Sequence, residues 1–277
     1  MTPFTDRLAD AVRRKGPLCV GIDPRLESLP VSIGEKHPDP AAAFEAFGLR
    51  ILELVAPFAG VVKPQAAFFE QLGPAGFAAM QAILRRAKEM GFVTILDAKR
   101  GDIASTATAY AEAAFGPTWD ADSLTVNPYL GRDAVEPFIQ TARQDGRGIF
   151  VLVRTSNPGA SLFQNLVCEG RPLYRHVADA VAEWNGTVGD VGAVVGATHP
   201  TELKELRAAM PGVWLLVPGY GAQGGTAADV RAAYDAKGLG AVVNSSRGVT
   251  FPFQPDDPNW EAKVEAAARK AQAELAV

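Results

Sequence analysis

Residues 92–103 read FVTILDAKRGDI, a segment that begins apolar and ends in alternating charges. Its apolar half is rich in β-branched residues, which predicts a strand that is buried on both faces. Residues 73–90, before it, have the composition of a helix, and a second helix is expected to begin near Ile103. A buried strand between two helices is typical of a parallel sheet covered by helices.

The same unit recurs along the chain. The apolar runs are LCVGIDP from Leu18, GVVKPQ from Gly60, FVTILDAKR from Phe92, SLTVNPY from Ser123, GIFVLVRTS from Gly148, VGAVVGAT from Val191, VWLLVPGYG from Val213 and GAVVNSSRG from Gly240. Eight strand–helix units in 277 residues predict one α/β domain, residues 1–277, folded as a closed (β/α)8 barrel, a TIM barrel. An extra N-terminal helix is expected at residues 4–14. A doubly wound open sheet is the alternative, which the lack of GxGxxG after the first run disfavours.

Composition excludes several classes of partner. The 27 basic and 31 acidic residues give a net charge of −4 without a basic patch, so we expect no nucleic-acid or membrane partner. No run of ~18 apolar residues and no apolar leader is present, which predicts a cytoplasmic protein. Cys19 and Cys168 lack CxxC spacing, and we expect both to be reduced and buried. His37, His176 and His199 lack metal-ligand spacing, so no metal site is predicted.

Two connections are longer than the repeat requires. They run from Arg25 to Asp39 after the first strand and from Asn157 to Pro172 after the fifth. Because both follow a strand, we expect long loops at the end of the barrel where active sites are built. Neutral surface insertion is the alternative, and the second connection is the better candidate for a lid.

The charges at the end of the third strand indicate chemistry. The two-residue period of a strand puts Asp97 and Lys99 on one side, and Asp102 follows. Lys63 ends the neighbouring second strand, so the four charges can form a cluster that keeps Lys99 an ammonium able to donate a proton. A structural ion pair, with Asp102 capping the next helix, is the alternative. A Schiff-base aldolase is disfavoured because its lysine must be neutral.

The loops after the last two strands predict an anion site. PGYGAQGG, residues 218–225, and NSSRG, residues 244–248, let backbone N–H groups approach a phosphate, and Arg247 can grip its oxygens as a planar fork. Structural turns are the alternative. At other strand ends, Asp23, Asn127 and Ser156 are candidates either for ligand contacts or for turn chemistry.

These motifs resemble those of the orotidine 5′-phosphate decarboxylase family. DAKRGDI, residues 97–103, matches the signature DxKxxD, and GIDP, VVKP, TVNPYLG, VRTSNPG, PGYGAQGG and NSSRG occur in the expected order. The TSNPG and PGYGAQGG forms are similar to the longer bacterial branch. The resemblance implies conversion of orotidine 5′-monophosphate (OMP) to uridine 5′-monophosphate (UMP) in pyrimidine biosynthesis, without a cofactor, by a homodimer with shared active sites.

The resemblance also implies roles by motif position. The implied catalytic tetrad is Lys63, Asp97, Lys99 and Asp102. The implied substrate contacts are Asp23 and Lys63 to the ribose, Ser156 to the pyrimidine, and Gln223 and Arg247 to the phosphate, with Asp102, Ile103 and Thr106 reaching into the partner's site. Whether Thr155 or Ser156 faces the base stays open. In this interpretation Lys99 stabilises and protonates the carbanion that forms at ring carbon C6.

Two other functions fit the same residues. A metal-dependent sugar-phosphate decarboxylase or aldolase on a similar barrel would use Asp97 and Asp102 to hold Mg²⁺. A phosphate-ligand binding protein without turnover would use only the loops around Arg247. Sensitivity to a chelator distinguishes the first, and loss of the ultraviolet absorbance of OMP excludes the second.

Overall fold

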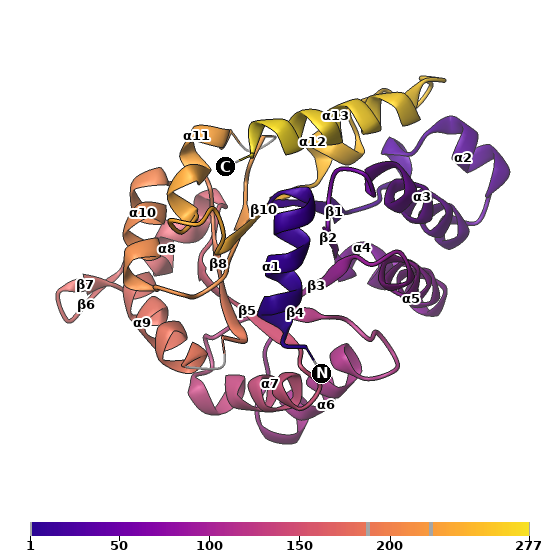
Figure 1. Ribbon diagram of the computed structural model, residues 1–277. Coiled ribbons are helices and arrows are strands. Elements are labelled where there is room, and N and C mark those ends of the chain that lie inside the picture. The colour runs from indigo at the N-terminus through magenta and orange to yellow at the C-terminus, as the bar shows by residue number, and fades with distance from the viewer. Residues whose placement is uncertain (1, 187–188, 222–223, 277) are drawn as a thin grey trace.

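In the computed structural model, which describes residues 2–186, 189–221 and 224–276, eight parallel strands close into a barrel (Figure 1). In order around the barrel they are β1 (Leu18–Ile22), β2 (Val61–Pro64), β3 (Val93–Arg100), β4 (Ser123–Val126), β5 (Gly148–Arg154), β8 (Val191–Val195), β9 (Leu215–Pro218) and β10 (Ala241–Ser245). Each predicted run contains one of these strands. Because β10 also pairs with β1, the predicted barrel is confirmed and the open sheet is wrong.

Most of the helices lie between successive strands and cover the outside of the barrel, whereas the first helix precedes β1 and the last follows β10 (Figure 1). They are α1 (Phe4–Lys15), α2 (Val31–Lys36), α3 (Pro40–Val55), α4 (Ala66–Glu70), α5 (Gly73–Glu89), α6 (Ala104–Phe115), α7 (Arg132–Gln144), α9 (Leu173–Asn185), α10 (Pro200–Ala209), α11 (Ala227–Val230), α12 (Arg247–Thr250) and α13 (Trp260–Glu274). The expected N-terminal helix is α1. In the part of the chain described, no helix combines the length and apolar character needed to cross a membrane.

Both long connections contain short elements of their own. The first holds a 3-10 turn (Leu26–Ser28) and α2. The second holds a 3-10 turn (Pro158–Ala160), α8 (Ser161–Gln164) and an antiparallel hairpin of β6 (Val167–Cys168) and β7 (Arg171–Pro172), which projects from the barrel in Figure 1. Both connections begin at the carboxyl end of a barrel strand, as expected for long loops on that face.

The two cysteines differ in exposure. Cys19 is buried inside the barrel, where burial raises the pKa of its thiol to about 12. Cys168 is exposed on the β6–β7 hairpin, so the prediction that both cysteines are buried is wrong for Cys168. The reason is local, because β6 pairs with β7 in a two-stranded sheet outside the barrel.

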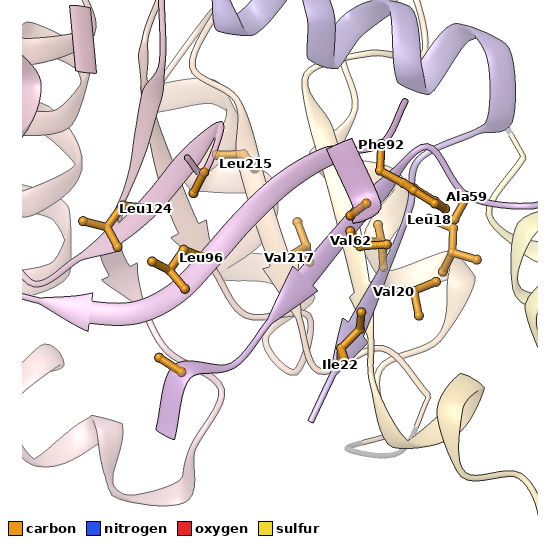
Figure 2. Close-up of a cluster of buried hydrophobic side chains, with 14 of the residues drawn as sticks. Leu18, Val20, Ile22, Ala59, Val62, Phe92, Leu96, Leu124, Leu215 and Val217 are labelled. Carbon is orange, nitrogen blue, oxygen red and sulfur yellow. The ribbon is translucent and has the colours of Figure 1, made fainter. Parts of the chain in front are cut away.

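Strand residues alternate between two hydrophobic cores. Outward side chains such as Val62 and Leu96 pack between the strands and the helices (Figure 2). Inward side chains such as Val61 and Ile95 fill the barrel and form one cluster with Phe4 of α1. The helix α1 therefore closes the amino-terminal end of the barrel, and the inward positions at the other end are left for polar residues.

Candidate active site

A cavity of about 360 Å³ opens at the carboxyl ends of the barrel strands. The strand period explains which side chains reach it, since Lys63 lies two residues after inward Val61 and Asp97 two residues after inward Ile95. The charged residues in its wall are Asp23, Lys63, Asp97 and Lys99. The cavity is thus a polar continuation of the apolar interior of the barrel.

Asp97 lies between two lysines. Lys63 donates from Nζ to Oδ2 of Asp97 at 2.6 Å, and Lys99 donates from Nζ to Oδ1 at 2.7 Å. Lys63 and Asp97 are 4% and 6% exposed, whereas the side chain of Lys99 is 46% exposed. Lys63 is therefore nearly enclosed although it lines the cavity, and its contact with a ribose stays a prediction. Lys99 carries its ammonium group at the accessible wall of the cavity.

The two buried charges keep each other ionised. Burial alone would raise the pKa of Asp97, but the ammonium groups of Lys63 and Lys99 outweigh it and hold that pKa below its usual range. Burial would lower the pKa of Lys63, but Asp97 and then Asp23 raise it above its usual value. Both groups are ionised at neutral pH, as the alternating charges predict.

The backbone at Lys99 adopts an unusual conformation. Its φ is +47°, in the left-handed region, and the register between β3 and β4 shifts between Leu96 and Arg100. Such a conformation costs an L-residue about 1 kcal/mol. Thr125 of β4 compensates, because its Oγ1 accepts from the backbone N–H groups of Ala98 at 3.0 Å and Lys99 at 2.9 Å. Thr125 was not predicted from the sequence, although strand alternation could have indicated that its side chain points into the barrel.

A second cavity, of about 530 Å³, adjoins the first. The two share Asp23, Pro218, Asn244 and Ser246 in their walls, and Arg247 lines the second one. Oδ1 of Asp23 and Oδ1 of Asn244 are buried and have no hydrogen-bond partner among the described residues. A buried acceptor without a donor costs about 1–3 kcal/mol, so these oxygens suit the hydroxyl groups of a bound ligand. Asn244 was not predicted from the sequence.

Thr155 and Ser156 both line the first cavity but differ in their bonding. The hydroxyl of Thr155 accepts from Nε2 of Gln164 at 2.8 Å and donates to Oδ1 of Asn157 at 2.6 Å. Gln164 also accepts from the N–H of Thr155 at 3.0 Å and from Arg154 at 3.1 Å. The second long connection thus fixes the backbone next to Ser156.

The whole chain matches known proteins. A family model described as "Orotidine 5'-phosphate decarboxylase / HUMPS family" matches residues 16–259. The chain belongs to this family. It is 48% identical over 300 residues to an orotidine 5′-phosphate decarboxylase from Rhodopirellula baltica, with 99% of each chain covered. A decarboxylase of the same name from Deinococcus radiodurans is 43% identical over 260 residues, covering 91% of this chain and 90% of the relative.

A solved structure agrees with the sequence match. The Leishmania donovani OMP decarboxylase is similar to this chain with a TM-score of 0.83 at 37% identity, covering 99% of this chain and 97% of that one. The predicted family and its carboxy-lyase class are thereby confirmed. The DxKxxD signature of the family, residues 97–102, spans the end of β3 and the loop after it.

Three residues of the predicted tetrad, Lys63, Asp97 and Lys99, meet within one chain, and the fourth does not. Asp102 accepts a hydrogen bond at Oδ1 from the N–H of Ile103 at 2.8 Å, and it does not line the cavity. Ile103 is the N-cap of α6 and no side chain caps that helix, so the alternative role of Asp102 as a helix cap is wrong. Ile103 and Thr106 are exposed and lie outside the cavity wall. Their contact with a partner's site stays a prediction.

The other predicted residues have different outcomes. Asn127 forms a turn, in which its Oδ1 accepts from the N–H of Tyr129 at 3.0 Å, and it lines neither cavity. Gln223 lies outside the described residues. Within those residues, no group of three or more His, Cys, Asp or Glu side chains is placed to hold a metal ion.

Proposed function

We propose that this chain decarboxylates OMP to UMP in pyrimidine biosynthesis, without a cofactor, and that Lys99 stabilises and protonates the product carbanion. The observation that carries the proposal is the array of Lys63, Asp97 and Lys99 at the wall of a cavity. The family match supports the overall reaction, because relatives that share 48% and 43% of their residues with this chain are named for it. The role of Lys99 is our own inference from the array.

The two adjoining cavities suggest how the nucleotide lies. Arg247 would bind the phosphate in the larger cavity, together with Gln223. Asp23 and Asn244 would accept hydrogen bonds from ribose hydroxyls at the junction, where both have a buried oxygen without a partner in the described part of the chain. The pyrimidine ring would then lie in the smaller cavity, which puts it beside Lys99.

Ser156 is the better candidate for the contact with the base. The hydroxyl of Thr155 is engaged by Gln164 and Asn157, as described above. The hydroxyl of Ser156 has no hydrogen bond to another described residue, and Ser156 lines the smaller cavity. It can therefore donate to a carbonyl oxygen of the pyrimidine.

Decarboxylation breaks the bond between C6 and the carboxylate and leaves its electron pair on C6. The ammonium group of Lys99 stabilises that charge as it develops and then gives C6 its proton, after which Lys99 regains a proton from solvent. Asp97 holds this ammonium in place through a 2.7 Å hydrogen bond. The substrate carboxylate would lie near Asp97, and binding of the remote phosphate offsets the repulsion between the two.

We also propose a homodimer in which Asp102, Ile103 and Thr106 complete the site of the partner subunit. Large apolar side chains are exposed on these neighbouring loops, with Ile103 at 55%, Tyr129 at 83% and Leu130 at 49%. A second copy of the chain would cover them. Asp102 would then join the charged array across the interface rather than within one chain.

A mixing experiment tests the shared site. Lys99→Ala and Asp102→Ala are each expected to be nearly inactive. After subunit exchange, random pairing would leave about a quarter of the sites intact, in the mixed dimers, and activity would return to that level. Two inactive variants that are dimeric, exchange subunits and recover no activity would show that each site is built from one chain.

The alternatives fit less well. A Mg²⁺ ion at Asp97 would lie next to the ammonium groups of Lys63 and Lys99, which already bind both carboxylate oxygens. The decisive assay follows the absorbance of OMP with the purified chain in excess EDTA. Complete conversion supports the proposal, whereas chelator-sensitive conversion favours the metal-dependent enzyme and unchanged absorbance favours a binding protein.

Two variants test the assigned roles. Lys99→Ala should remove nearly all turnover while UMP still binds, and near-normal turnover would contradict its role as proton donor. Arg247→Ala should mainly weaken nucleotide affinity. If uridine bound as tightly as UMP to the unmodified chain, the phosphate site would be assigned wrongly.

The proposal includes the setting of the enzyme. Residues 1–277 would act as one domain, since α1 and the inner strand residues share a core. A cytoplasmic location is consistent with two free cysteines, Cys19 and Cys168.

A further inference from the structure

The hydroxyl group of Thr125 makes three hydrogen bonds at the centre of the charged array. It accepts from the backbone N–H groups of Ala98 and Lys99, and it donates to Oδ1 of Asp97 at 2.9 Å. Thr125 comes from β4, whereas the three residues that it contacts belong to β3. It is 1% exposed.

Hydrogen-bond accounting fixes the direction of these bonds. A hydroxyl has one proton to donate, and a backbone N–H group can only donate. Because two N–H groups occupy the lone pairs of Oγ1, its proton must go to Asp97. Oδ1 of Asp97 therefore accepts one hydrogen bond from the hydroxyl of Thr125 and another from the ammonium group of Lys99, and both bonds constrain where that ammonium lies.

The register shift explains why a side chain is needed here. Regular pairing between β3 and β4 is interrupted between Leu96 and Arg100, and Lys99 has a φ of +47°. In a parallel ladder, the N–H groups of this segment would bond to backbone carbonyls of the next strand. The hydroxyl oxygen of Thr125 replaces those carbonyl acceptors. It thereby stabilises the left-handed backbone conformation at Lys99, whose side chain lines the cavity.

Packing alone does not call for a hydroxyl at this position. The apolar residues that share the cavity wall with Thr125 are Leu152, Val194, Leu216 and Pro218. Val has nearly the same shape as Thr and would fill the space among them. What Val lacks is the set of three hydrogen bonds.

We propose that Thr125 is a positioning residue for decarboxylation. Its hydroxyl holds the carboxylate of Asp97 and the ammonium group of Lys99 so that this ammonium faces ring carbon C6 of the substrate. The inference rests on the proposed role of Lys99. Thr125 itself does not contact the reacting atoms, because it acts through Asp97 and Lys99 on β3. Loss of the hydroxyl should therefore slow the chemical step and leave nucleotide binding intact.

The test compares Thr125→Val with Thr125→Ser. A catalytic group displaced by about 1 Å costs on the order of 10²-fold in rate, so kcat of Thr125→Val should fall by about that factor. KM for OMP and the dissociation constant of UMP should change less than about threefold, because the phosphate and ribose contacts are untouched. Thr125→Ser keeps the hydroxyl and should recover kcat to within about fivefold of the unmodified chain.

Thr94→Val is a matched control on the same pair of strands. Thr94 is also 1% exposed, and its hydroxyl bonds to Asp122, far from the cavity wall. This variant should lose stability and keep its kcat. If Thr94→Val and Thr125→Val lost kcat equally, a general loosening of the barrel would explain both results and the proposal would be wrong.

The remaining outcomes also decide the question. The proposal is overturned if Thr125→Val keeps kcat within about threefold, or if Thr125→Ser is as slow as Thr125→Val while both bind UMP normally. Failure of the proposed function is a different result, in which the unmodified chain does not convert OMP or Lys99→Ala keeps its turnover. In that case a crystal structure of Thr125→Val still tests the inference, because φ of Lys99 and its distance to Asp97 should both change.

Discussion

A buried aspartate held by two cations and a threonine hydroxyl occurs at both ends of the strand pair β3 and β4. At the amino-terminal end, Asp122 is 1% exposed. Its Oδ1 accepts from Arg7 and from Nη1 of Arg147 at 2.7 Å, and its Oδ2 accepts from the N–H and hydroxyl of Thr94 at 2.9 and 3.1 Å. At the carboxyl end, Asp97 has Lys63, Lys99 and Thr125 in the corresponding roles.

The two clusters differ in whether they leave proton donors and acceptors accessible to a ligand. Asp122 is bound by two arginines, which are always charged and cannot deliver a proton at neutral pH, and it does not line either cavity of the site. The array at Asp97 uses lysines, one of which is 46% exposed, and a buried oxygen of the nearby Asp23 lacks a partner among the described residues. Buried charges alone therefore do not mark an active site. Accessible donors and unpaired oxygens at a cavity do.

The largest expected effect is a difference in kcat between variants of Asp97 and of Asp122. Asp97→Asn removes the anion that positions Lys99, so kcat should fall on the order of 10³-fold. Asp122→Asn should leave the kcat of the folded enzyme within about threefold of the unmodified chain. Steady-state kinetics on OMP at a temperature where both variants are folded measures this. Equal losses of kcat would show that the two ends are not functionally distinct.

The free energy of unfolding should distinguish Asp122 from Asp97 in the opposite way, with the main loss of stability in Asp122→Asn. Asp122→Asn leaves two arginines without their buried carboxylate and should lower the free energy of unfolding by roughly 3 kcal/mol. Urea denaturation followed by circular dichroism gives this quantity. A change below about 1 kcal/mol would mean that the Asp122 cluster contributes no more than a surface ion pair.

The pH dependence of the site should change when its enclosed cation is removed. In the unmodified chain the pKa of Asp97 is lowered, so its stabilising contribution is lost only as pH falls through that depressed value. In Lys63→Met, burial still raises the pKa of Asp97, but the larger of the two cationic contributions that lower this pKa is removed. The pKa of Asp97 should rise by at least about one unit, and the acid limb of kcat should move to higher pH by the same amount.

A matched variant controls for this shift. Arg147→Met removes a cation from Asp122, which touches no part of the cavity wall. Its pH profile of kcat should coincide with that of the unmodified chain. An acid limb that stays in place in Lys63→Met would contradict the role given to Lys63.

The smallest effect concerns the backbone conformation at Lys99. Its φ of +47° is strained for any residue with a Cβ, so Lys99→Gly should be more stable than Lys99→Ala by roughly 1 kcal/mol. Both variants lack the ammonium group, and both should be inactive. Thermal or urea denaturation of the pair measures the difference, and equal stabilities would indicate that this turn carries no strain.

Much of the fold and part of the site follow from strand periodicity. Eight apolar runs predict the barrel, and the two-residue period brings Lys63 and Asp97 to one cavity because each lies two residues after an inward residue, Val61 or Ile95. Thr125 could not be predicted in its role, because the register shift that creates its two N–H donors depends on how β3 pairs with β4. The turn formed by Asn127 was one of two interpretations that its position allowed.

Other details depend on contacts between segments far apart in the sequence. The preference for Ser156 over Thr155 comes from Gln164, and this residue reaches back to the strand end only when the second connection has folded. Asn244 was overlooked because the glycines and Arg247 dominate its segment, although its inward parity on β10 could have identified it.

The exposure of Cys168 makes the natural chain convenient for spectroscopy. Its only other thiol, Cys19, is enclosed in the barrel and has a pKa raised to about 12, so a maleimide dye would attach to Cys168 alone. The dye would be carried on the β6–β7 hairpin, which belongs to the same connection as Gln164. Fluorescence from this single label would reveal whether the hairpin shifts when a nucleotide enters, without any engineered cysteine.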